Sequence, residues 1–291
     1  MGVVTKAIQM DKLAVGRGEW WRRLKRNRAA LAGFFLLSSF LLLAGFAPFI
    51  APYSPTQQVL EVRLSPPSFS HLFGTDDLGR DILSRIIYGA RISLFVGAVS
   101  VGISLLFGTP LGAAAGYFGG RVDQVIMRMM DVLLAFPGFL LAVLIVGSFG
   151  PSLENAMAAI GIVGIPIYAR LVRSSVLALK EEAFVEAAEA LGVNRARILF
   201  RHIFPNCLAP LIVQSSLGFG TAILETAGLS FLGLGAQPPA PEWGATLAGG
   251  RAWILTAPWI VAFPGLAILC VVLGFNLLGD GLRDTLNGGR A

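Results

Sequence analysis

The sequence predicts an all-α membrane protein with six transmembrane helices, because its charged residues are few and are separated by long apolar stretches. Only 14% of the 291 residues are charged and 55% are hydrophobic, whereas a soluble protein carries roughly a quarter charged residues. A helix needs about 20 apolar residues to cross the hydrocarbon of a bilayer. Five stretches reach that length without a charged side chain: 29–60, 92–120, 132–153, 202–224 and 252–279.

A sixth span is predicted from residues 155–169, which are too few to cross a bilayer by themselves. The helix can extend past Arg170 and Arg173 if these two side chains snorkel to the edge of the membrane. We therefore expect six spans rather than five.

The positions of Lys and Arg predict which side of the membrane each loop occupies. With the N-terminus inside and six spans, 18 of the 23 Lys and Arg residues fall on the inner side and 5 on the outer side. Cytoplasmic loops are enriched in these residues. We therefore expect both termini in the cytoplasm, and the same distribution explains the net charge of +6 without a nucleic-acid partner.

Residues 1–28 are predicted to form a basic cytoplasmic tail, in which Trp20 and Trp21 favour a helix lying on the membrane surface. Residues 29–51 follow as the first transmembrane helix. The hydrophobic part of a cleaved signal peptide has only about 7–15 residues, so we interpret this longer run as a retained helix. Residues 52–88 are predicted to form a loop on the outer, periplasmic or extracellular side, since four prolines interrupt them: Pro52, Pro55, Pro66 and Pro67.

The other five helices are expected within residues 89–285. The second span is predicted at about 90–116, where glycines recur at every fourth position. Small residues on one face let another helix approach closely in a membrane, so we interpret this strip as a packing surface. Its members are Gly108, Gly112, Gly116 and Gly120.

A short inner turn, 118–130, is expected before the third span, which the Phe136-Pro137 pair should kink. Residues 148–155 should form an outer turn, and the fourth span should end near Leu177. The fifth and sixth spans are expected at about 208–231 and 258–279.

The inner loop at 181–205 is predicted to contain a short amphipathic helix. Glu182, Glu186 and Glu189 recur at helical spacing and form an acidic stripe. The apolar stripe of the same helix is predicted to consist of Phe184, Ala188 and Leu191.

Three further residues predict how this loop continues. Gly192 should stop the helix, Asn194 should cap a second short helix, and Pro205 should end that helix before the fifth span. The helix pair would form a rigid projection on the cytoplasmic side. By physics alone, an ordinary amphipathic surface helix explains the pattern equally well.

The stretch that contains Glu186-Ala187-Ala188, Gly192, His202 and Phe204-Pro205 resembles the EAA loop of bacterial ABC-importer permeases in order and spacing. His202 stands where many members of the wider family have an aliphatic residue, although the peptide branch often has histidine. The resemblance implies a coupling helix that docks into a groove on an ATPase subunit. The ATPase-coupling residues that it implies are Glu182, Glu186, Ala187, Ala188, Glu189, Gly192 and Pro205.

Other motifs are similar to signatures of the C-type permeases of dipeptide and oligopeptide importers. They are Phe73–Asp76 with Gly79–Asp81, Gly89–Leu94, Asp131–Pro137 and Leu229–Gly235. The resemblance implies a type I ABC importer permease that forms half of a peptide pathway across a bacterial or archaeal plasma (inner) membrane.

The implied partners are a homologous second permease subunit, two ABC ATPase subunits that bind ATP and Mg²⁺, and an extracytoplasmic solute-binding protein. No cofactor, metal or enzymatic activity is expected in this chain itself. It has no glycine-rich phosphate-binding loop ending in Gly-Lys-Ser/Thr. His71 and His202 are expected on opposite sides of the membrane, and Cys207 and Cys270 are interpreted as packing residues.

Two acidic residues are candidates for the substrate pathway. Glu225 is predicted near the middle of the fifth span, where a carboxylate costs roughly 2.5–3.5 kcal/mol unless it faces protein or water. It could meet the amino group of a substrate or form a structural hydrogen bond, and both interpretations stay open. Asp131 is expected nearer the inner boundary, where a structural role is favoured.

The sequence leaves one alternative cargo and two other classes of protein to weigh. The same machinery could carry nickel chelates or oligosaccharides. An ion-driven secondary transporter would require inverted halves and ionisable pairs near the midplane of the membrane, and the sequence offers one central acid. A purely structural membrane anchor leaves the acidic helix and its glycine stop unexplained.

Overall fold

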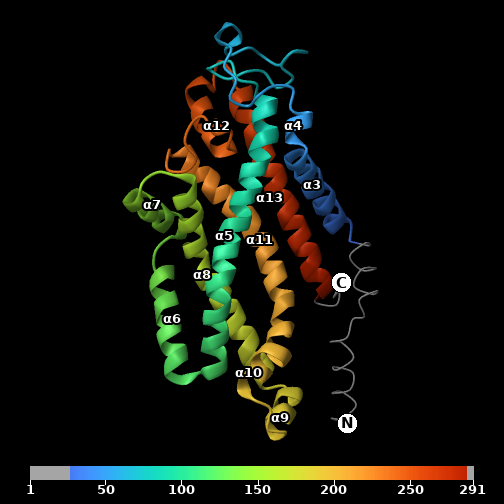
Figure 1. Cartoon of the computed structure of the whole chain (residues 1–291), viewed down its shortest axis with the longest axis vertical. Helices are drawn as coiled ribbons and strands as arrows, with labels where there is room; N and C mark the ends of the chain where they lie inside the picture. Colours follow the sequence, from blue (N-terminus) through green and yellow to red (C-terminus); the bar gives the residue numbers. More distant parts are fainter. Residues whose placement is uncertain (1–26, 287–291) are drawn as a thin grey trace.

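Five long helices run along the molecule, and each is long and apolar enough to cross a membrane (Figure 1). The computed structural model describes residues 27–286, so the surface helix predicted around Trp20 and Trp21 lies outside the described residues. The long helices are α3 (Arg28–Gly45), α5 (Ile82–Phe118), α8 (Leu153–Lys180), α11 (Phe204–Phe231) and α13 (Trp259–Leu286).

The third predicted span is a bent pair of helices, α6 (Gly120–Leu134) and α7 (Gly138–Phe149). Their axes differ by 86° at the break. Pro137 lies directly before α7 and has no backbone N–H to continue the hydrogen-bond ladder of α6. The kink predicted at Phe136-Pro137 is therefore confirmed, and it is a complete break in the helix.

Residues 118–130 do not form the turn that the sequence predicts, because most of them belong to α6. The reversal is made by Gly119 and Gly120, whose φ angles are 65° and 52°. Glycine adopts these left-handed conformations at little cost because it has no Cβ. The chain therefore turns within two residues, and α6 runs back beside α5 (Figure 1).

The second span begins earlier than the sequence predicts, at Ile82. The side chain of Asp81 accepts a hydrogen bond of 2.8 Å from the backbone N–H of Ser84 and so caps α5. The segment before α5 contains two short helices, α4 (Ala47–Ile50) and η1 (Leu60–Val62).

The glycine strip of α5 packs against α8, as predicted. A Cβ atom at Gly112 would lie 2.2 Å from the carbonyl oxygen of Ala169, and those at Gly108 and Gly116 would lie 2.7 and 2.9 Å from other carbonyl oxygens of α8. Gly120 is an exception, since it follows the end of α5 and has open space around it. The two backbones therefore approach as closely as small residues permit.

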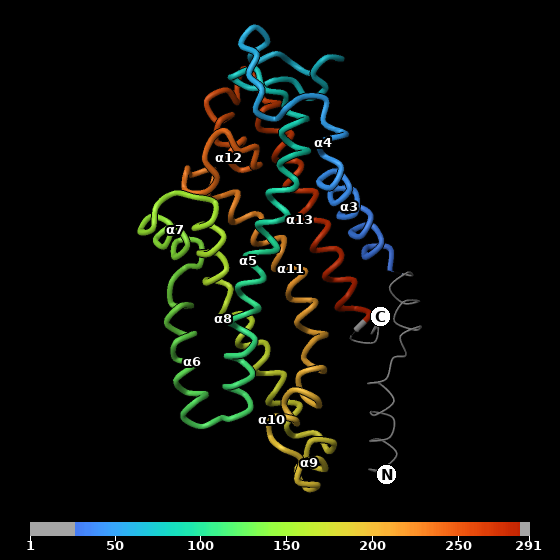
Figure 2. The backbone as a smooth tube through the Cα atoms, viewed as in Figure 1, coloured from blue at the N-terminus to red at the C-terminus, as the bar shows by residue number. Residues whose placement is uncertain are grey.

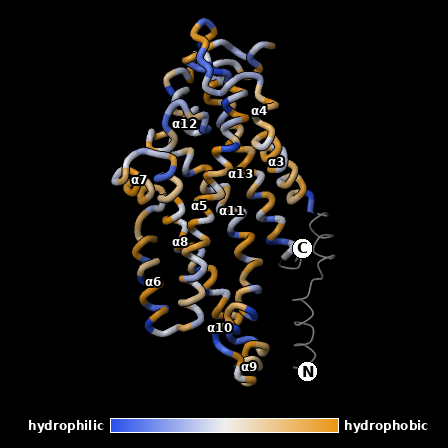
Figure 3. Tube along the Cα trace, viewed as in Figure 1, coloured by the Kyte–Doolittle hydropathy of each residue, from blue (hydrophilic) through white to orange (hydrophobic). Residues whose placement is uncertain are grey.

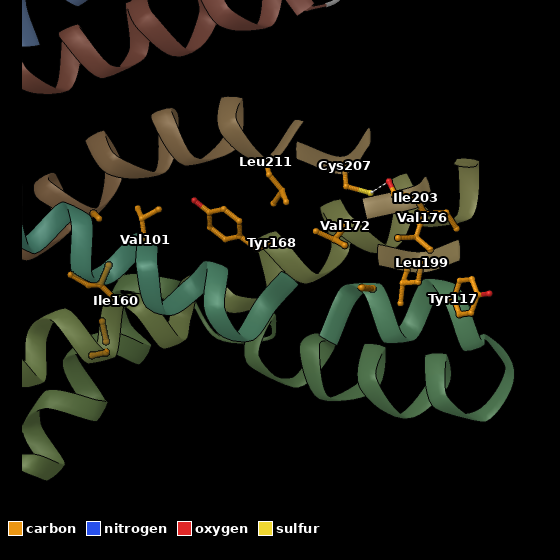
Figure 4. Close-up of a cluster of buried hydrophobic side chains, with 14 of the residues drawn as sticks. Val101, Tyr117, Ile160, Tyr168, Val172, Val176, Leu199, Ile203, Cys207 and Leu211 are labelled. Atoms are coloured by element: carbon orange, nitrogen blue, oxygen red, sulfur yellow. Dashed lines mark hydrogen bonds between the residues drawn. The ribbon is translucent and has the colours of Figure 1, made fainter. Parts of the chain in front are cut away.

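A hydrophobic cluster joins α5, α8 and α11 with the short helices that precede α11. Figure 4 shows its side chains pointing toward one another, with Tyr168 and Val172 contributed by α8. Cys207 is buried in this cluster, which confirms that it packs in the interior. A second cluster joins α3, α5, α11 and α13 around the buried Trp243.

The two ends of the molecule carry different structures (Figures 1 and 2). At one end, here called the α9 end, α9 (Ala183–Ala190) and α10 (Arg195–Arg197) project beyond the long helices, and a π-helical turn, η2 (Ile198–Ile203), leads back into α11. The opposite, loop end carries residues 52–81 and α12 (Trp243–Gly250), which η3 (Arg251–Trp253) follows. Figure 3 shows that apolar residues predominate along the helices between these ends.

Candidate functional site

The α9 end presents the residues that the sequence predicts for contact with another protein. Figure 1 shows α9 at the tip of the molecule, beyond the ends of α8 and α11. Carboxylates and small side chains share its exposed surface, so another protein can approach the helix backbone closely and bind it by charge. The exposed residues of this kind are Glu182, Ala183, Glu186, Ala187, Glu189 and Ala190.

The apolar face of α9 differs from the predicted one. Val185 and Ala188 are 1% and 7% exposed and belong to the hydrophobic cluster. Phe184 and Leu191, which were predicted to face inward, are 40% and 83% exposed. The reason is that α9 packs mainly against η2 and the end of α8, so few of its residues reach the interior. The side chain of Ala188 therefore packs inward instead of facing a partner, while Phe184 and Leu191 join the outer surface.

Gly192 ends α9, as predicted. Its φ angle is 73°, its N–H donates to the carbonyl oxygen of Glu189 at 2.9 Å, and the N–H of Val193 donates to that of Ala188 at 3.1 Å. This pair of bonds is a Schellman motif, which satisfies the last carbonyl groups of a helix. A side chain at position 192 would meet open space, so the requirement for glycine is conformational.

Asn194 caps the next helix, since its side chain accepts a hydrogen bond of 2.9 Å from the N–H of Ala196. Pro205, however, does not end a helix, because it lies in the first turn of α11. The π-helical turn before it bonds the N–H of Phe204 to the carbonyl oxygen of Leu199, five residues back. Proline is tolerated in a first turn, so the chain passes from α10 into α11 without a break.

Two contacts connect the α9 end to the membrane helices. The side chain of Lys180, at the end of α8, donates a hydrogen bond of 2.9 Å to the carbonyl oxygen of Tyr117 near the end of α5. Val185 and Ala188 share a hydrophobic cluster with residues of α5, α8 and α11. Because Val185 and Ala188 pack in the same cluster as residues of these helices, a force on α9 would reach all three of them.

The loop end holds a buried group of charges that the sequence motifs only partly indicated. Arg80 Nε lies 2.6 Å from Asp76 Oδ2, and Arg85 Nε lies 3.9 Å from the same oxygen. All three side chains are buried. A buried charge is costly unless it is paired, so these residues hold the loop in place.

Arg85 and Trp259 attach the loop to the other elements at this end. The guanidinium of Arg85 donates to the carbonyl oxygens of Pro55 and Ala240 at 3.1 and 3.2 Å. Trp259 Nε1 donates to the carbonyl oxygen of Thr75 at 3.2 Å, across 184 positions of sequence. No local pattern relates residues so far apart, so the sequence analysis missed both roles.

Asp131 joins α6 to α8. Its Oδ1 atom lies 2.7 Å from Arg170 Nη2, and both side chains are about half exposed. Asp123 of α6 forms a second ion pair with Arg173 of α8. The ion pair agrees with the structural role that the sequence favours for Asp131, and its place in the substrate pathway stays a prediction.

Glu225 lies in different surroundings, in a recess of about 100 Å³ between α5, α8 and α11. It precedes Phe231, the last residue of α11, by six positions and is thus nearer the end of the helix than predicted. Gln214 and Thr221 line the same recess. The sequence analysis missed these two, although they precede Glu225 by 11 and 4 positions and share its helix face.

Two models of known protein families match this chain. Residues 108–289 match the family described as binding-protein-dependent transport system inner membrane component. Residues 17–67 match the N-terminal transmembrane domain of oligopeptide transport permease C. This chain belongs to the family of binding-protein-dependent transport permeases. The permease is therefore a multi-pass subunit of an ABC importer in the inner membrane.

The permease is similar to curated relatives over nearly its whole length. It is 55% identical to the dipeptide transport system permease protein DppC of Alkalihalophilus pseudofirmus, over 92% of this chain and 88% of the relative. It is 52% identical to DppC of Escherichia coli K12, over 98% and 96%. It is 46% identical to the glutathione transport system permease protein GsiD of Pectobacterium atrosepticum, over 92% and 90%. The names of these relatives thus refer to more than one kind of cargo.

The fold of the permease is similar to that of a solved ABC importer. An inward-facing structure of the MetNI methionine ABC transporter matches with a TM-score of 0.57 over 70% of this chain and 97% of that chain. Only 16% of the aligned residues are identical, so this likeness concerns the fold. The predicted all-α, type I ABC importer permease fold is confirmed.

Proposed function

We propose that the permease forms half of a pathway for di- and oligopeptides and that ATPase subunits drive it through α9. The single observation that carries the coupling role is the position of α9, which projects beyond the long helices with its carboxylates outward and Val185 and Ala188 anchored inside. The peptide cargo is supported by the names of relatives that match over most of this chain and by the motif of Phe73–Asp76 with Gly79–Asp81 in the loop before α5.

The proposed assembly contains a homologous second permease, two ATPase subunits that bind ATP and Mg²⁺, and an extracytoplasmic solute-binding protein. In this arrangement the α9 end and both termini face the cytoplasm, and the loop end faces the binding protein. The excess of Lys and Arg in the segments assigned to the inner side supports this orientation. The permease itself would bind no cofactor and catalyse no reaction.

The proposed motion begins when ATP draws the two ATPase subunits together. Each ATPase would carry α9 with it, because exposed Glu182, Glu186 and Glu189 are available to basic residues of a partner. The contact of Lys180 with Tyr117 would make α5 and α8 move together. The pathway would then change from open inside to open outside as rigid elements rotate.

Charge reversal at Glu186 tests this coupling. In the complete complex reconstituted into liposomes, Glu186→Lys should reduce ATP-driven peptide uptake by at least about tenfold, because it places like charges at the contact. ATP hydrolysis by the ATPase subunits should continue without being linked to uptake. Uptake and hydrolysis measured on the same preparation would show the separation.

Glu61→Lys is the matched control, since it reverses an exposed charge at the opposite end of the molecule. It should leave the ratio of uptake to hydrolysis unchanged. A cysteine at position 186 should also crosslink to an ATPase subunit. Full uptake by Glu186→Lys together with the absence of that crosslink would refute the proposal.

A further inference from the structure

The recess around Glu225 is formed by three membrane helices and has a polar lining on one side. α5 contributes two hydroxyl groups, α8 contributes one phenol, and α11 contributes an amide, a hydroxyl and the carboxylate. The recess has a volume of about 100 Å³. Its polar lining consists of Ser100, Ser104, Tyr168, Gln214, Thr221 and Glu225.

Two glycines make the room for these polar groups. A Cβ atom at Gly218 would lie 2.6 Å from the hydroxyl oxygen of Tyr168, and one at Gly164 would lie 2.3 Å from Ser104 Oγ. Gly218 lies on the same face of α11 as Gln214, Thr221 and Glu225, since these positions follow the helical repeat. The sequence of α11 therefore builds a polar face into a largely apolar helix.

The serine and threonine hydroxyl groups of the recess can accept hydrogen bonds from a ligand, but their own protons are already donated elsewhere. Ser100 Oγ donates to the carbonyl oxygen of Met157 at 3.1 Å, and Ser104 Oγ donates to that of Gly161 at 2.7 Å. Thr221 Oγ1 likewise donates along its own helix. Because each hydroxyl proton is already used, its oxygen lone pairs remain available.

The recess carries negative charge when Glu225 is ionised. Among the described residues that line it, Glu225 is the one ionisable acid, and Lys, Arg and His are absent from the lining. Gln214 adds an amide with both an acceptor oxygen and an NH2 donor, while the hydroxyl oxygens act as acceptors. A carboxylate beside such acceptor oxygens favours a cation that donates several hydrogen bonds. An alkylammonium group has this chemistry.

The recess opens to the surface of the permease between α8 and α11. Thr221 is exposed and Glu225 is half-buried, whereas Ser100 and Tyr168 lie deeper. A carboxylate at this depth would not face lipid, because charged side chains in membranes face protein or water. A separate apolar cavity of about 1290 Å³ lies along another side of α11 and is lined by residues such as Leu208, Ile212 and Phe219. The α8–α11 face is thus the one suited to an aqueous pathway.

We infer that this recess binds the positively charged amino group of a peptide as the cargo crosses the membrane. The inference rests on the proposed transport of peptides. A water molecule occupies about 30 Å³, so the recess can hold an ammonium group and its nearest atoms but not a whole dipeptide. The rest of the peptide lies in the pathway outside the recess, so the recess does not select among peptides by their side chains.

Cysteine labelling of the assembled complex tests the charge preference without requiring transport. Thr221→Cys is made in a background with Cys207→Ala and Cys270→Ala, and is treated with aminoethyl and sulfonatoethyl methanethiosulfonate. Rates are normalised to Phe69→Cys, a fully exposed position at the loop end. The cationic reagent should react about tenfold faster relative to the anionic one, and Glu225→Gln should remove this preference.

Two controls make the labelling result decisive. Ile212→Cys on the apolar side of α11 should react slowly with both reagents, and Glu154→Gln, an exposed acid at the start of α8, should leave the preference at Thr221→Cys unchanged. If Thr221→Cys does not assemble, Gln214→Cys takes its place. Equal labelling by both reagents, or a preference that persists in Glu225→Gln, would overturn the inference.

Peptide uptake separates this inference from the proposed function. Glu225→Gln should reduce uptake of peptides with a free amino terminus about tenfold, while Glu154→Gln should transport like the unaltered permease. Full uptake by Glu225→Gln would refute the amino-group site and leave the proposed function intact. If the unaltered complex moves no peptide, the proposed function fails, and the assignment of the recess to cargo fails with it.

Discussion

At the scale of single residues, the loop end shows how buried charges are stabilised in a membrane protein. Asp76 is paired with Arg80, and Asp81 is bound by the backbone and hydroxyl groups of Ser84. Glu242 differs, since it is 2% exposed and its carboxylate caps α12 by accepting a hydrogen bond of 2.8 Å from the N–H of Ala245. A buried carboxylate without a basic partner is sensitive to pH.

The stability of the permease should depend on the protonation of Glu242. Burial raises the pKa of this carboxyl, and hydrogen bonds from Gly244, Ala245 and Ser230 offset the rise only in part. The folded state thus keeps its proton to a higher pH than the unfolded chain, so folding stability falls as pH rises above the ordinary pKa of about 4.3. Glu242→Gln keeps an acceptor for the helix cap and should remove this loss.

Thermal unfolding of the purified permease between pH 4 and pH 8 measures this effect. The midpoint of Glu242→Gln should rise relative to the unaltered permease as pH increases. Glu61→Gln changes an exposed acid and should show no such trend. A relative midpoint that falls with increasing pH would contradict the sign derived from burial.

At the scale of helices, the contact between α5 and α8 depends on the absence of side chains. Gly112→Ala would place a Cβ atom 2.2 Å from the carbonyl oxygen of Ala169. Since a backbone atom cannot move aside as a flexible side chain does, we expect the substitution to lower the free energy of unfolding by about 1–3 kcal/mol. Unfolding of the purified permease in detergent would measure the loss.

Gly102→Ala is the matched control on the same helix, because nothing lies within 4 Å of the added Cβ. Alanine favours a helix over glycine by about 1 kcal/mol, so this variant should be as stable as the unaltered permease or more stable. Equal stabilities for Gly112→Ala and Gly102→Ala would show that α5 and α8 can separate without cost.

Two prolines show why an element cannot be derived from residue type alone. Pro137 separates α6 from α7 by a bend of 86°, whereas Pro205 lies within a continuous passage from η2 into α11. The sequence predicts a kink at the first and a helix end at the second. The difference lies in the position of each proline: Pro137 follows the last turn of α6, whereas Pro205 lies in the first turn of α11, where its missing N–H interrupts no hydrogen bond within that helix.

At the scale of the whole molecule, the proposed orientation places the α9 end in the cytoplasm and the loop end outside. Phe69→Cys and Ala190→Cys lie at these two ends and are exposed. In intact cells, a membrane-impermeant maleimide should label Phe69→Cys and should label Ala190→Cys only after the membrane is permeabilised. Labelling of Ala190→Cys in intact cells would reverse the orientation.

The whole molecule also shows how far the sequence analysis reached. The long apolar helices, the break at Pro137, the end of α9 at Gly192 and the glycine strip were predicted from local patterns, and the structure confirms them. The buried face of α9 was not predicted correctly, because Val185 is a core residue through its contact with η2 and α8. The partners of Arg85 and the recess around Glu225 were also beyond prediction from one sequence.

The sequence by itself determined that this protein spans a membrane and which family it belongs to. Hydropathy is a sum over neighbouring residues, and a motif is a spacing along the chain, so both are complete before folding. The tertiary structure decided which face of each helix is buried, how Asp76, Arg80 and Arg85 share their charges, and that Gln214, Thr221 and Glu225 meet hydroxyl groups of two other helices. These facts depend on distances between residues far apart in sequence, which only the packing of the helices fixes.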